Sequence, residues 1–148
     1  MSLFDQLNEE MKLAMRARDK PRLGVIRMAI SAIKLAKIDN QAEMTETDIL
    51  ALITKMIKQR KESVAMFTEG GREDMAANEQ AEILVLEEFL PQALSADEIA
   101  QLIADAIAQT GAASMADMGK VMGILKPKMQ GKADLGQVSG QVRAALNA

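Results

Sequence analysis

The stretch TETDILALITKMIKQRKESVAMF, Thr45 to Phe67, decides the fold class of this 148-residue chain. It opens with Thr45 and, three residues later, Asp48, a pair that forms a capping box at the start of a helix. Apolar residues then recur at the spacing of one helix face: Ile49, Leu52, Ile53, Met56, Ile57, Val64 and Phe67. The stretch therefore predicts a long amphipathic helix that ends at Gly70-Gly71.

The same helical period continues on both sides of this stretch. No run of β-branched and aromatic residues alternates as a strand requires. Start signals and apolar stripes predict seven helices, which begin near Ser2, Pro21, Thr45, Arg72, Ser95, Ser114 and Asp134. The chain is therefore predicted to be all-α.

A proline marks the boundary between two predicted domains. Pro91 ends the fourth helix because proline cannot continue one, and Ser95 opens the next helix with a capping box. We therefore expect a four-helix N-terminal domain over residues 1–92 and a three-helix C-terminal domain over residues 93–148. The short connection favours a fairly fixed relation between them.

Charge favours antiparallel pairing of the third and fourth helices. The third is rich in lysine and arginine, whereas the fourth carries six acidic residues. Ion pairs are expected along the seam, but exposed pairs contribute only about 0–1 kcal/mol each. Burial of apolar side chains must therefore provide most of the stability.

Two missing residue types exclude most catalytic machinery. The chain has no Cys and no His, so thiol nucleophiles, Cys/His zinc sites and imidazole bases are absent. Its serines have no histidine partner, and di-metal helical bundles need Glu-x-x-His motifs. We therefore expect no catalytic residue, no cofactor and no metal belonging to this chain alone.

The N-terminal sequence carries no recognisable targeting signal. Its first ten residues include three acidic ones and no apolar core of signal length. No apolar run approaches the roughly 18 residues that span a membrane. A cytoplasmic protein without membrane attachment is the expectation.

A basic stretch, MGKVMGILKPKMQGKAD from Met118 to Asp134, stands out because the whole chain has a net charge of −3. It is not a phosphate-binding P-loop, since no Ser or Thr follows either Gly-Lys pair. With three Phe and no Tyr or Trp, recognition of RNA by stacking of bases on aromatic side chains is nearly excluded. The mode of nucleic-acid binding that is still possible is contact between lysines and the phosphates of a structured nucleic acid. The residues expected to make them are Lys120, Lys126, Lys128 and Lys132.

The alternative to phosphate contacts is that these lysines form a solvated, lysine-rich helix end, which the helix dipole favours.

Two glycines in the same stretch, Gly119 and Gly123, are four residues apart and share one helix face. They are expected to let a neighbouring helix or a nucleic-acid backbone come close.

A second polar cluster is predicted on the second and third helices. Arg27, Ser31 and Lys34 follow at i, i+4 and i+7 and project to one side, and Lys58 and Arg60 add charge from the next helix. The cluster is either a groove for an anion or the polar side of two helices tied to the acidic fourth helix.

Several motifs together resemble the GatB/YqeY family, in order along essentially the whole chain. They are Lys58-Gln-Arg-Lys-Glu-Ser63, Gly71-Arg-Glu-Asp74, Glu79 through Glu88 into Phe89-Leu-Pro-Gln92, Met118-Gly-Lys-Val-Met-Gly123 and Gly131-Lys-Ala-Asp134. The resemblance implies a small protein with four helices followed by three. It also implies that the C-terminal part is similar to the tail domain of the B subunit of the tRNA-dependent glutamine amidotransferase, which contacts the tRNA.

Two functions follow from this resemblance as expectations. The first is a noncatalytic tRNA-binding module that uses the basic surface of the C-terminal domain. The second is an accessory subunit, without an active site, that binds a glutamine-dependent aminoacyl-tRNA amidotransferase or another translation protein. The family is associated with carbon-nitrogen ligase activity with glutamine as amido-N-donor, but nothing in this chain matches the amidase or the ATP-binding site of the large enzyme. Enzymatic activity of the chain by itself is not expected.

Overall fold

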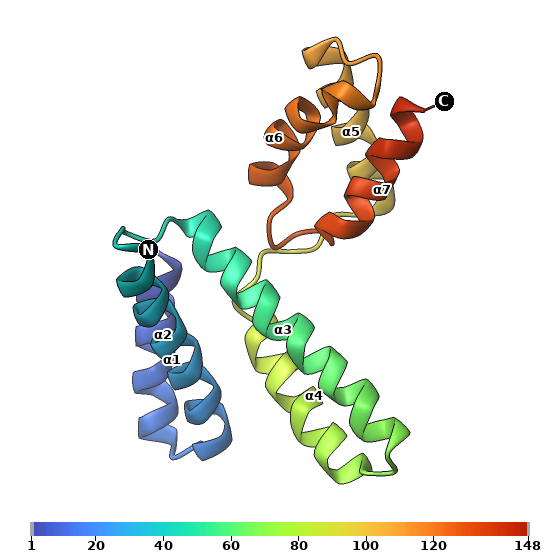
Figure 1. Ribbon diagram of the computed structural model, residues 1–148. Coiled ribbons are helices and arrows are strands. Elements are labelled where there is room, and N and C mark those ends of the chain that lie inside the picture. Colours follow the sequence, from blue (N-terminus) through green and yellow to red (C-terminus); the bar gives the residue numbers. More distant parts are fainter. Residues whose placement is uncertain (1, 148) are drawn as a thin grey trace. The chain divides into compact units, whose positions relative to one another are not determined.

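The computed structural model describes residues 2–147, which are helical with no strand (Figure 1). The predicted all-α class is confirmed. The elements are α1 (Leu3–Ala17), α2 (Lys20–Asn40), α3 (Glu46–Glu69), α4 (Glu73–Glu87), α5 (Ala96–Thr110), the short 3-10 helix η1 (Met115–Asp117), α6 (Met118–Met129) and α7 (Leu135–Leu146).

The chain forms two compact units, one up to Leu90 and one from Pro91. Helices α1 to α4 belong to the first unit, and α5 to α7 belong to the second. The division into a four-helix domain over residues 1–92 and a three-helix domain over residues 93–148 stays a prediction.

Most helices begin at the residues that the capping signals indicated. The Ser2 hydroxyl accepts a hydrogen bond from the backbone N–H of Asp5 at 3.1 Å. Before α3, the Thr45 hydroxyl accepts from the N–H of Asp48 at 3.1 Å, and the Asp48 carboxylate accepts from the N–H of Thr45 at 3.0 Å. Ser95 caps α5 through its hydroxyl. These bonds satisfy amides that have no partner inside the helix.

The start of α6 differs from the prediction. Ser114 makes no capping bond with its side chain, and residues 115–117 form η1 before the α-helix begins at Met118. The Asp117 carboxylate instead accepts a hydrogen bond from the backbone N–H of Ala113 at 3.0 Å. A tight 3-10 turn is a common entry to an α-helix, and here it moves the cap of the helix from Ser114 to Asp117, three residues downstream.

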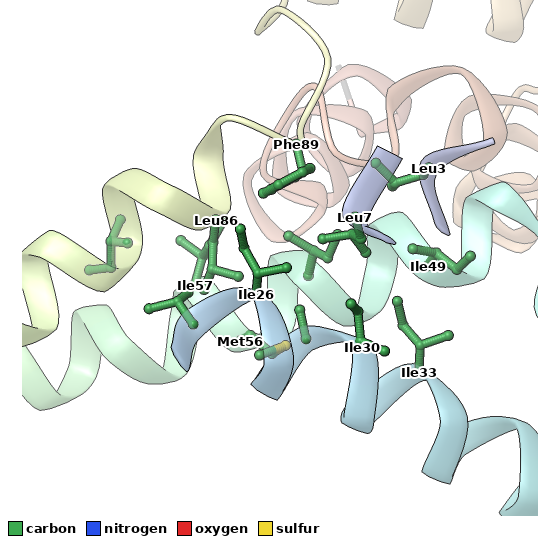
Figure 2. Packing of buried hydrophobic residues seen from close by; sticks show 14 of the residues in the cluster. Leu3, Leu7, Ile26, Ile30, Ile33, Ile49, Met56, Ile57, Leu86 and Phe89 are labelled. Atoms are coloured by element: carbon green, nitrogen blue, oxygen red, sulfur yellow. The ribbon is translucent and has the colours of Figure 1, made fainter. Parts of the chain in front are cut away.

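The core of the first unit joins two helical hairpins, α1 with α2 and α3 with α4. Figure 2 shows side chains from all four helices meeting, among them Leu7, Ile26, Ile57 and Leu86. Leu7 and Ile26 are completely inaccessible to solvent, and Leu86 is 1% exposed. Each such side chain contributes about 1.5–3 kcal/mol through removal from water.

The α3–α4 pair is antiparallel, with its chain reversal at Gly70-Gly71 (Figure 1). Among residues 2–147 one ion pair joins the two helices, between Arg60 Nε and Glu82 Oε2 at 2.9 Å. The seam is thus held by apolar burial, with this half-buried ion pair in place of the expected row.

In the second unit, α6 supplies the centre of the core. Val121, Leu125 and Met129 follow at four-residue intervals and are fully buried. Side chains from α5 and α7 pack with them: Ile103, Ala106, Val138, Val142 and Leu146. Because one face of α6 is buried against its neighbours, the opposite face is left at the surface.

Candidate nucleic-acid interface

The exposed face of α6 is smooth at its centre and basic at its edges. Gly119 and Gly123 are exposed, and a Cβ atom built at either position has no atom of another residue within 4 Å apart from the adjoining helix backbone and chain neighbours. Lys120 and Lys126, both exposed, lie three residues before and three residues after Gly123. At 100° per residue they flank Gly123 at about 60° on either side.

No helix of the second unit covers this glycine face. Close packing between helices of that unit therefore does not explain Gly119 and Gly123. Each glycine in a helix interior costs about 1 kcal/mol relative to alanine. Close approach of an outside molecule remains the prediction for these two positions.

Pro127 removes one backbone hydrogen bond from α6. The helix continues through Pro127 and ends at Met129. Because proline has no N–H, the carbonyl of Gly123 has no donor at the i+4 position. This carbonyl lies between the two flanking lysines in the helix sequence.

The remaining two predicted lysines lie at and beyond the end of α6. Lys128 is exposed in the last turn, where the helix dipole favours a positive charge. Lys132 is half-buried in the turn before α7. Gly131, with φ of +78°, allows that turn, and the N–H of Leu94 donates to the carbonyl of Lys132 at 2.9 Å. Three of the four lysines are therefore readily available to a ligand.

The lysines of this surface are not neutralised by the protein. In the described part of the chain, none of Lys120, Lys126, Lys128 and Lys132 lies within 4 Å of a carboxylate. The pKa of Asp117 is lowered mainly by the hydrogen bond from the N–H of Ala113, with a smaller effect of the positive charge of Lys120. The second unit thus presents unpaired cations on α6 and just after it.

The predicted polar cluster of the first unit is divided. Arg27, Ser31 and Lys34 are exposed along α2, as their spacing indicated. Arg60 turns inward: it pairs with Glu82, and its Nη2 lies 3.8 Å from the sulfur of Met28. Lys58 is exposed and, two residues from Arg60, projects from nearly the opposite side of α3.

Sequence reasoning missed a row of exposed apolar residues on α2. Met28, Leu35 and Ile38 are 42%, 59% and 71% exposed. Their spacing of seven and three residues was a visible signal, because it places them on the same side as Arg27 and away from the buried stripe.

Surface hollows in the described residues do not assemble catalytic groups. One of about 510 Å³ between α5 and α7 is lined largely by alanine and isoleucine. Another of about 560 Å³ has Glu9, Glu10 and Glu88 around Arg22, which pairs with Glu10 and Glu88. Within residues 2–147, no three carboxylates are grouped to hold a metal ion. No helix in this range combines the length and apolar character needed to cross a membrane.

Comparison with known proteins gives the family. The model of the family described as Yqey-like protein matches residues 4–146. A curated relative, altered inheritance of mitochondria protein 41, mitochondrial, of Pyrenophora tritici-repentis, is 30% identical over 99% of this chain and 82% of its own length. Proteins of the same name are 37% identical in Kluyveromyces lactis, over 56% of this chain, and 36% identical in Lachancea thermotolerans, over 62%. The matched regions cover 45% and 50% of these two relatives, so this chain spans about half of their length. The match to the family model covers nearly the whole chain, which therefore belongs to the YqeY-like family.

Proposed function

We propose that this protein is a noncatalytic tRNA-binding module that contacts RNA through the exposed face of α6. The observation that carries the proposal is the glycine face of α6, which nothing in the second unit covers and which unpaired lysines flank. The resemblance of these motifs to the tail domain of the amidotransferase B subunit points to tRNA as the nucleic acid.

Each part of this face suits an RNA backbone. Lys120 and Lys126 supply positive charge for phosphates, and Lys128 extends the basic surface at the end of the helix. Gly119 and Gly123 allow the ribose-phosphate chain to approach the helix backbone. The carbonyl of Gly123, which lacks its i+4 donor, is proposed to accept a hydrogen bond from a ribose 2′-hydroxyl, the group that distinguishes RNA from DNA.

The interaction should be weak and strongly dependent on salt. Each phosphate contact contributes roughly 0.7–0.9 to the slope of log K against log salt concentration. The three exposed lysines therefore predict a slope of about −2 to −3. Stacking on bases is not expected to contribute, because the chain has no Tyr or Trp and only three Phe.

The experiment measures binding of bulk deacylated tRNA to the full chain at several salt concentrations. In Lys120→Gln/Lys126→Gln the slope should become shallower, its magnitude decreasing by roughly 1.5. The matched control is Lys55→Gln/Lys61→Gln on α3, which changes two exposed lysines outside the proposed surface and should leave the slope nearly unchanged. A DNA hairpin of equal length should bind more weakly than its RNA counterpart. Equal slopes for the two variants, or no binding at 50 mM salt, refute the proposal.

A second candidate is an accessory subunit that binds an amidotransferase or another translation protein. The observation that favours it is the exposed apolar row on α2, which RNA binding by α6 does not use. Co-purification from a ribonuclease-treated lysate tests it. A stoichiometric protein complex supports the accessory role, whereas its absence together with recovery of tRNA from an untreated lysate contradicts it.

We also propose that this protein is located in the cytoplasm. The relatives from Kluyveromyces lactis and Pyrenophora tritici-repentis are named as mitochondrial proteins. Fractionation of cells that express the full chain, with detection by antibody, tests the location directly. Exclusive recovery in an organelle fraction contradicts it.

A further inference from the structure

The outer face of α2 has the pattern of a helix-packing surface, yet within its own unit most of it is uncovered; at one edge, Arg60 of α3 touches the sulfur of Met28. Its apolar row is Met28, Leu35 and Ile38, which are 42%, 59% and 71% exposed. The core stripe of the same helix, which includes Ile26 and Ile33, lies on the other side and is buried. Single exposed apolar residues are ordinary, but three along one face of one helix make that face a candidate for docking a partner.

A row of cations runs beside the apolar row. Lys20, Arg27 and Lys34 follow at intervals of seven residues, and all three are exposed. In the described part of the chain, none of them lies within 4 Å of a carboxylate. The face is therefore apolar along one edge and uniformly positive along the other.

Small residues lie between the two rows. Gly24 and Ser31 are again seven residues apart, and a Cβ atom at Gly24 would meet nothing within 4 Å. Ile38, seven residues further, ends this central line and is the apolar residue nearest the cations. A seven-residue repeat keeps the same residues facing a partner when two helices wind around each other. Small central residues let the partner helix come close. The repeat extends from Lys20 to Ile38, about 27 Å of helix at 1.5 Å per residue.

We propose that this outer face of α2 docks an amphipathic helix of a partner protein, with acidic residues along one edge of its apolar face. Such a helix matches both rows: its apolar residues cover Met28, Leu35 and Ile38, and its carboxylates meet Lys20, Arg27 and Lys34. An RNA backbone would use the cations only and would leave the apolar row in water. This proposal rests on the accessory-subunit candidate, whose docking surface it specifies, and the α2 face shares no residue with the proposed RNA-binding surface.

A synthetic peptide of about 21 residues tests the proposal against the full chain. It carries leucine at helical core positions and glutamate along one flank, and a second peptide carries lysine in place of glutamate. Fluorescence anisotropy should show the acidic peptide binding at least tenfold more tightly than the basic one. Leu35→Ser/Ile38→Ser should weaken binding at least tenfold, and Arg27→Gln/Lys34→Gln should weaken it and flatten its salt dependence.

The matched control is Leu84→Ser on α4, which removes a leucine that is 58% exposed on an acidic helix and should leave the affinity unchanged. Equal binding of the acidic and basic peptides, or full affinity in Leu35→Ser/Ile38→Ser, overturns the proposal. So does preferential binding of the chain to vesicles of anionic phospholipid, or to tRNA, that is lost in Leu35→Ser/Ile38→Ser. Circular dichroism of each variant confirms that the helices are intact.

Discussion

Replacing Gly123 by alanine should make the protein more stable. Gly123 lies in the middle of α6, outside the set of residues with positive φ, and a Cβ atom there meets no neighbouring side chain. The substitution therefore gains helix propensity without strain or overlap. The expected gain is about 1 kcal/mol in the free energy of unfolding.

Gly111 offers a control that differs in one respect. It is also open to solvent, with nothing within 4 Å of a Cβ atom, but its φ is +66° at the end of α5. Alanine in this left-handed conformation costs roughly 1–2 kcal/mol. The two substitutions add the same methyl group to the same unit, and they should change stability in opposite directions.

Amide hydrogen exchange of α6 is the assay that reports this locally. For backbone amides of the helix interior, Gly123→Ala should slow exchange by about fivefold, the equivalent of 1 kcal/mol. Gly111→Ala should speed exchange in the second unit by a similar or larger factor. Faster exchange in Gly123→Ala would refute the assignment of that position to an open helix face.

The same variant connects stability to the proposed function. If an RNA backbone approaches α6 at Gly123, the added methyl group should weaken tRNA binding although the protein is more stable. Unchanged tRNA affinity in Gly123→Ala would show that tRNA does not approach the helix backbone at Gly123. The lysines would then bind tRNA without the glycine face.

Three further predictions test the fold and its pH dependence. Leu125→Ala leaves a cavity at the centre of the second core and should lower the free energy of unfolding, measured with urea, by about 2–5 kcal/mol. Leu84→Ala, at an exposed position, should change it by less than about 0.5 kcal/mol. Similar losses in the two variants would contradict the assigned burial. Thr45→Ala breaks one half of the capping box and should cost about 1 kcal/mol, measured by the same method. Asp117 has a lowered pKa in the folded protein, so its contribution to stability is complete above the unfolded value of 3.8 and is lost as the pH falls through the lower folded pKa. Unfolding of the wild type and Asp117→Asn between pH 2 and 6 should therefore differ above pH 4 and converge in strong acid; a constant difference would refute the role of this carboxylate.

Local signals made the helices predictable. The starts of α1, α3 and α5 follow from hydroxyl side chains that bond amides three residues away, and such contacts need no other part of the fold. The start of α6 was missed because Asp117 bonds backward to Ala113 and a 3-10 turn precedes the helix. Two geometries were compatible with the same Ser-x-x-Asp sequence.

The candidate sites were only partly predictable. Spacing alone placed Gly119 and Gly123 on one face of a helix, but the sequence left open whether a neighbouring helix would cover them. The sequence left open whether Arg60 joins Lys58 in a groove for an anion or ties its helix to the acidic fourth helix. Packing brought Glu82, 22 residues further along the chain, within 2.9 Å of Arg60. The partner of Arg60 is therefore the carboxylate that the turn at Gly70-Gly71 brings close in space, and Lys58, its neighbour in sequence, projects elsewhere.

The sequence by itself determined that this protein is all-α and where most of its helices begin, because hydrogen bonds within a few residues set both. Only the tertiary structure decided which apolar faces became core. Helix α2 is apolar on two sides, and its periodicity alone does not distinguish them. Packing of the other three helices buried the side that holds Ile26 and left Leu35 and Ile38 in water, since burial depends on which surfaces meet.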